Sequence, residues 1–152
     1  MPSITPSYLY TFIALIAVSS LLLFSFMTYA NALRFSSEVR QLKNLMDYVA
    51  AETTELITFT LKTNATAQSF LQMPTTIGDK QYWLQLRNDS IKAWLEAGFG
   101  SSLTQGTELR VYFPKKVLAM GYYVGGYGAA KLECYPDGGV LRIQLSSVTE
   151  GE

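Results

Sequence analysis

The sequence predicts an α+β protein, with one long N-terminal helix, transmembrane and then amphipathic, followed by a small antiparallel β-sandwich or curled sheet. Three observations support this fold class. Residues 8–30 carry no charge, residues 31–64 contain neither proline nor glycine, and residues beyond 68 form short alternating runs separated by turn residues. These patterns are typical of a membrane-spanning helix, an amphipathic helix and a set of strands.

The same patterns divide the chain into three parts. Residues 1–33 are predicted to form a tail and a transmembrane helix, residues 34–63 an amphipathic helical stalk, and residues 64–152 an extracytoplasmic β domain. The formal net charge is zero, and the first charged side chain is Arg34. Because the longest cationic run is the pair Lys115 and Lys116, we expect no nucleic-acid partner.

The charge-free segment is long enough to cross a membrane. At about 1.5 Å per residue, a helix over residues 8–30 spans roughly 35 Å, and a hydrocarbon core is about 30 Å thick. A cleaved secretory peptide would begin with basic residues and have a shorter apolar run, so we expect the segment to be retained. The residues predicted to face lipid or neighbouring helices include the following: Tyr8, Phe12, Leu15, Leu22, Phe26 and Tyr29.

An apolar stripe continues along the helix beyond the membrane segment. Its members are spaced alternately by four and three residues, and we call them the stalk stripe: Phe35, Val39, Leu42, Met46, Val49, Thr53 and Leu56. This spacing predicts a single helix over residues 8–62, roughly 80 Å long. The stalk stripe could face the protein's own β domain or identical helices in an assembly, and both alternatives remain open at this point.

The remaining residues predict six or seven strands. Alternating or aromatic-rich runs cover residues 81–87, 91–97, 108–113, 117–124, 129–135 and 140–145. Turn residues at 88–90 and 136–139 predict two hairpins. The β domain is therefore expected to present one face of its strands to a core and the other to solvent or a partner.

No residue pattern indicates a catalytic, cofactor or metal site. The chain has no histidine, which excludes a Ser-His-Asp triad, and its one cysteine, Cys134, is predicted to be a small apolar side chain in a strand. Tyr127 and Lys131 have the spacing of a short-chain dehydrogenase pair, but no Gly-rich nucleotide loop accompanies them. We expect no enzyme, no cofactor and no small-molecule substrate; a small membrane-anchored enzyme is the least favoured alternative.

Two features bear on membrane topology and they disagree. The sequons that begin at Asn64 and Asn88 are candidate N-glycosylation sites, which favours an extracytoplasmic β domain. Arg34, Arg40 and Lys43 follow the apolar segment, and the positive-inside rule would place them in the cytoplasm.

The layout of an apolar helix, an amphipathic helix and a small β domain resembles the archaeal type IV pilin-like proteins: pilins, archaellins and archaellum accessory subunits. The resemblance covers nearly the whole chain but depends on no diagnostic motif. It implies a membrane location, self-association or assembly with related subunits, and contact with a cell-surface layer. It also implies a leader ending in Lys/Arg-Gly, whereas only residues 1–7 precede the apolar run in this sequence.

Two functions follow as expectations. The first is a pilin-like cell-surface structural protein whose helix mediates assembly and whose β domain is displayed outside. The second is a non-polymerising single-pass protein whose β domain acts in adhesion or as an accessory module.

Overall fold

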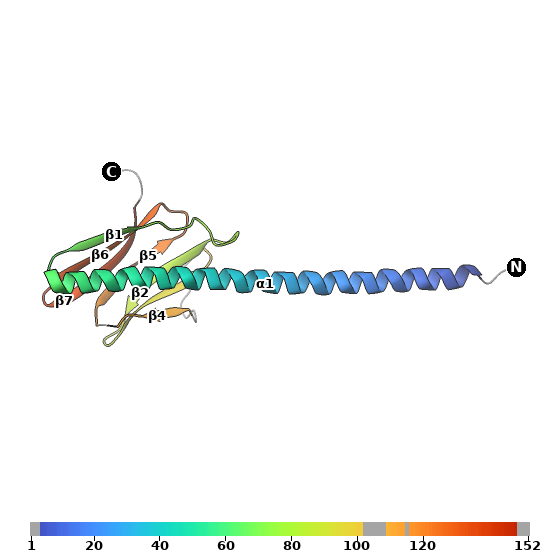
Figure 1. Cartoon of the computed structure of the whole chain (residues 1–152), viewed down its shortest axis with the longest axis horizontal. Helices are drawn as coiled ribbons and strands as arrows, with labels where there is room; N and C mark the ends of the chain where they lie inside the picture. The colour runs from blue at the N-terminus through green and yellow to red at the C-terminus, as the bar shows by residue number, and fades with distance from the viewer. Residues whose placement is uncertain (1–3, 102–108, 115, 149–152) are drawn as a thin grey trace. The chain divides into compact units, whose positions relative to one another are not determined.

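The computed structural model describes residues 4–101, 109–114 and 116–148. One helix, α1 (Ile4–Thr63), precedes seven strands. Figure 1 shows the long helix at the N-terminal end of the chain and the strands after it. The strands are β1 (Ala67–Leu71), β2 (Tyr82–Asn88), β3 (Ala93–Phe99), β4 (Arg110–Tyr112), β5 (Leu118–Val124), β6 (Ala129–Asp137) and β7 (Val140–Val148). The predicted α+β fold class is confirmed, and a single curled sheet takes the place of the sandwich alternative.

The chain divides into two compact units, Met1–Val39 and Arg40–Glu152. The second unit contains the C-terminal part of α1 together with all seven strands. Its core joins five apolar helix residues of the stripe region to the inward-facing residues of the sheet: Leu42, Met46, Val49, Ala50 and Ile57. Helix residues from Arg40 onward are therefore part of the β domain's own fold.

The helix ends at a residue that can adopt a left-handed backbone. Asn64 has a φ of 51°, and its N–H donates to the carbonyl oxygen of Thr60 at 2.8 Å. Asparagine tolerates this conformation better than most residues do. The hydrogen bond from its N–H satisfies one of the unpaired carbonyls of the last turn. The reversal lets β1 begin only three residues later, at Ala67.

The sheet has the strand order β1-β6-β7-β5-β2-β3-β4. Both predicted hairpins are present, as the antiparallel pairs β2–β3 and β6–β7. In the first, Asp89 Oδ1 accepts hydrogen bonds from the backbone N–H groups of Lys92 and Ile91, which hold the pKa of Asp89 below its usual value. In the second, β6 continues through Pro136 and Asp137, and Gly138 and Gly139 form the turn with positive φ.

One pairing differs from the expected antiparallel pattern. β5 and β7 are parallel, with β6 serving as the connection between them, so β7 lies between β6 and β5. Gly121 allows the close approach, because a Cβ on this residue would collide with the carbonyl oxygen of Leu145 and its φ is +104°. The strand predicted over residues 108–113 is shorter in the structure, where β4 covers Arg110–Tyr112. Residues 102–108 lie outside the described part.

Helix α1 covers one face of the sheet. The residues of β2 and β3 on that face include Tyr82, Leu84 and Leu95, and none of them is exposed. Cys134 of β6 is buried there too, as predicted, and its burial raises the pKa of the thiol. The Ser69 hydroxyl of β1 donates to Glu52 Oε2 of α1 at 3.5 Å. We call the opposite face of the sheet, which α1 leaves uncovered, the outer face.

The packing of α1 on the sheet predicts that Leu42→Ala lowers the free energy of unfolding of the β domain by about 3 kcal/mol, since it opens a cavity at a fully buried position. Urea unfolding of the full chain in detergent, followed by the fluorescence of Trp83 and Trp94, measures this loss. The control is Leu22→Ala, whose side chain is exposed and which should change the same transition by less than about 0.5 kcal/mol. Equal effects of the two changes would contradict the assignment of Leu42 to the core.

Candidate functional site

The first unit carries an apolar surface that is exposed on every side of the helix. The six membrane-facing candidates are between 61% and 72% exposed: Tyr8 72%, Phe12 62%, Leu15 61%, Leu22 66%, Phe26 70% and Tyr29 64%. The helix is long and apolar enough to cross a membrane. So large a contiguous apolar surface needs lipid or protein to cover it.

Three hydroxyls in this segment are satisfied within the helix itself. The hydroxyls of Thr11, Ser20 and Thr28 donate to the carbonyl oxygens of Ser7, Ile16 and Phe24, at 3.0, 2.7 and 2.9 Å. In hydrocarbon an unpaired hydroxyl is costly, and a bond to the carbonyl four residues earlier removes that cost. These hydroxyls therefore do not prevent the segment from lying in lipid.

The stalk stripe is divided between the two units. Leu42, Met46 and Val49 are buried in the core of the β domain, and Leu56 packs partly buried against that core. Phe35 and Val39 belong to the first unit, where Phe35 is 53% exposed. The sequence left open whether the stalk stripe faces the protein's own β domain or identical helices. In the structure, the middle of the stalk stripe packs against the protein's own sheet.

Both candidate glycosylation residues are exposed. Asn64 follows the last residue of α1, and Asn88 is the last residue of β2, beside the turn that leads to β3. Their positions at the ends of elements leave room for a bulky substituent on the surface.

The outer face carries an ionic cluster that was not predicted from the sequence. Glu96 of β3 is fully buried, and its carboxylate lies between two arginines: Arg87 Nη1 is 3.4 Å from Oε2, and Arg110 Nε is 3.2 Å from Oε1. Strand register explains the arrangement, because Glu96 is directly opposite Arg110 in β4. The signal was available in the alternation of residues 93–97, which places Glu96 on the polar face.

Aromatic rings extend this cluster toward the edge strand β4. The rings of Trp94 and Tyr112 lie 6.0 Å apart, and the Arg110 guanidinium lies 5.6 Å from the centre of the Trp94 ring. Interaction with the Tyr112 side chain, and then the attraction of Glu96, raises the pKa of Arg110. The cluster thus combines one buried carboxylate, two guanidinium groups and a tilted pair of rings.

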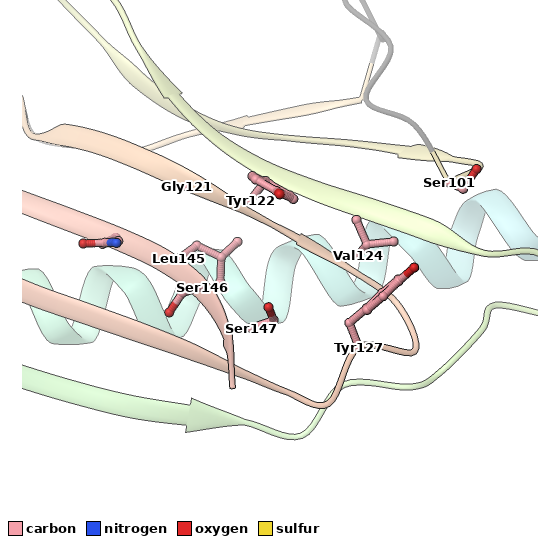
Figure 2. A pocket seen from close by; sticks show the side chains of 9 residues that line it. Ser101, Gly121, Tyr122, Val124, Tyr127, Leu145, Ser146 and Ser147 are labelled. Atoms are coloured by element: carbon pink, nitrogen blue, oxygen red, sulfur yellow. The ribbon is translucent and has the colours of Figure 1, made fainter. Parts of the chain in front are cut away.

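A cleft of about 580 Å³ opens between β5 and β7, where the two strands diverge (Figure 2). Their parallel pairing ends at Gly121 and Leu145. Beyond that point β5 pairs with β2, and β7 continues to pair with β6. The lining contains residues that point to each face of the sheet, so the cleft is a gap in the sheet rather than a depression on one side.

Comparisons with protein-family models, with curated proteins and with solved structures find no match to this chain. Among the described residues, no group of three or more His, Cys, Asp or Glu side chains could hold a metal ion.

The Glu96 cluster predicts that removing the two arginines and removing the carboxylate lower the stability by unequal amounts. Arg87→Met/Arg110→Met leaves a buried carboxylate unpaired, which in buried ion pairs costs about 3–5 kcal/mol. Since both arginine side chains are 37% exposed, we expect the low end of that range. Glu96→Gln should cost less, because the arginines that remain can reach water.

Urea unfolding of the three variants checks this asymmetry: the arginine pair, Glu96→Gln, and the triple change. Adding Glu96→Gln to the arginine pair should restore part of the lost stability. If the triple change is less stable than the arginine pair, the buried carboxylate is not the source of the loss.

Proposed function

We propose that the chain is a pilin-like cell-surface structural protein. In this proposal the exposed apolar part of α1 mediates assembly with other copies or related subunits, and the β domain is displayed outside. The observation that supports it is the double use of α1, which supplies the apolar surface of the first unit and the core layer of the second. Because α1 is continuous, a single helix would connect the displayed domain to the segment that assembles.

The exposed apolar surface is compatible with either lipid or identical helices. Ser19, Ser20 and Ser25 are small residues within the segment, and small residues let helix backbones approach closely. Helices that pack in this way in the membrane could pass into a filament core without a change of surface. This consideration favours assembly, with the membrane as the reservoir of subunits.

The alternative is a non-polymerising anchored β domain. The internal hydrogen bonds of Thr11, Ser20 and Thr28 favour it, because a hydroxyl that is bonded within its own helix needs no partner on a neighbouring helix. The two functions differ in what covers Phe12 and Phe26: another protein in the first, lipid in the second.

Assembly predicts sensitivity to side-chain shape at constant hydropathy. Phe12→Leu/Phe26→Leu keeps the segment apolar and long enough to insert, but alters the surface that neighbouring helices would contact. We expect at least a tenfold loss of filaments in sheared-cell fractions examined by electron microscopy, with an unchanged amount of protein in the membrane fraction. Filaments at wild-type abundance in the variant, or none from the wild-type protein, would favour the lone anchor.

Display of the β domain outside predicts labelling from the external medium. Gln68→Cys places a thiol on an exposed residue of β1, and a membrane-impermeant maleimide should label it in intact cells. The wild-type protein is the matched control, because its one thiol, Cys134, is buried and should stay unlabelled. Labelling of Gln68→Cys only after lysis would place the domain in the cytoplasm, as the basic residues after the apolar segment suggest.

A further inference from the structure

The cleft between β5 and β7 has the composition of a binding site for an uncharged, hydroxyl-rich ligand. Among the described residues, its polar side chains include three serine hydroxyls and one amide, besides the two tyrosine hydroxyls; the serines and the amide are those of Ser101, Ser146, Ser147 and Gln144. None of the described residues that line it carries a charge. A hydroxyl both donates and accepts hydrogen bonds, and an amide offers both on separate atoms, so these groups can match a ligand whose own groups do the same.

Two tyrosines supply the apolar part of the site. Tyr122 on β5 and Tyr127 in the turn after it are 57% and 58% exposed, although rings of this size are usually much more buried. Figure 2 shows both rings on the β5 side, with Ser146 and Ser147 on β7. The backbone that carries these rings is held in a strand and a tight turn, so they offer flat apolar surfaces without a cost in backbone entropy.

The turn that carries Tyr127 is held in place by two contacts. The Tyr123 hydroxyl donates to the carbonyl oxygen of Gly128 at 2.7 Å, and the Gln81 amide donates to the carbonyl oxygen of Gly125 at 3.0 Å. Gly126 and Gly128 have positive φ, which the turn requires. The position of the Tyr127 backbone is therefore set by the fold rather than by the ligand.

We propose that this cleft binds a neutral saccharide. The C–H face of a sugar ring would lie on Tyr122 or Tyr127, and its hydroxyls would exchange hydrogen bonds with Gln144, Ser146 and Ser147. The volume of about 580 Å³ falls within the range of small-ligand sites, roughly 300–1,000 Å³. The absence of charge among the described lining residues disfavours phosphorylated and acidic sugars, whose anionic groups would be left unpaired.

A peptide strand is the other class of ligand that could enter a gap in a sheet. Inserted strands keep a spacing of about 4.7–4.9 Å from each neighbour. β5 and β7 are in contact at Gly121 and Leu145 and diverge from there, so the width of the gap changes along its length. A strand could keep this spacing from both edges at only one depth, which favours a compact ligand over an extended one.

The site does not depend on filament assembly, so saccharide binding can be tested independently of the proposed function. The probes are methyl glycosides of glucose, galactose, mannose and N-acetylglucosamine and their neutral trisaccharides, added to the full chain in a detergent without a sugar headgroup. The readouts are saturation-transfer NMR on the sugar and shift changes at the ring carbons of labelled tyrosine. We expect at least one neutral saccharide to bind with shifts confined to Tyr122 and Tyr127.

Variants separate the cleft from the rest of the surface. Tyr122→Ala/Tyr127→Ala should weaken binding at least tenfold, and Ser147→Phe, which fills the cleft from β7, should do the same. Phe70→Ala is the matched control, because Phe70 is a ring on β1 that is 60% exposed and does not line the cleft. Its affinity should equal that of the wild-type protein.

Several outcomes would overturn the proposal. These are no binding of any neutral saccharide at millimolar concentration, equal or tighter binding of sialylated or phosphorylated sugars, and unchanged binding in both cleft variants. Tighter binding of a short extended peptide of alternating valine and threonine than of any saccharide would identify the gap as a strand-pairing site instead.

Discussion

The β domain depends on the contact between one face of a single curled sheet and one side of α1. A sheet with an apolar face needs a second layer, and in this protein Leu42, Met46, Val49 and Ile57 supply it. No other helix is present among the described residues to take that place. The contact constrains the chain further, since residues that follow a long apolar segment must also satisfy the packing of seven strands.

Much of this arrangement could be predicted from local patterns. The spacing of the stalk stripe identified Leu42, Met46, Val49 and Thr53, all of which are buried, and two turn sequences identified both hairpins. At the end of the stripe the most deeply buried residue shifts for a geometric reason. A repeat of 3.5 residues drifts by about 20° per heptad on a straight helix, so after three heptads Ile57 has replaced Leu56 as the buried residue.

The features that could not be predicted depend on pairings between residues far apart in sequence. β7 lies between β6 and β5 and pairs in parallel with β5. Both facts follow from the order of strands in the whole sheet. The Glu96 cluster needs β2, β3 and β4 in register, and the cleft exists because β5 leaves β7 to pair with β2. Each residue was visible as polar or aromatic, but only strand order brings them together.

Strand order also affects how the protein folds during synthesis. β7 is C-terminal to every other strand, yet it lies inside the sheet and joins β1 and β6 to β5, β2, β3 and β4. A nascent chain that lacks β7 therefore holds two incomplete sheets, although the helix that will cover them has already been made. Closure of the domain must wait until β7 has emerged from the ribosome, which leaves the growing polypeptide dependent on protection from aggregation until then.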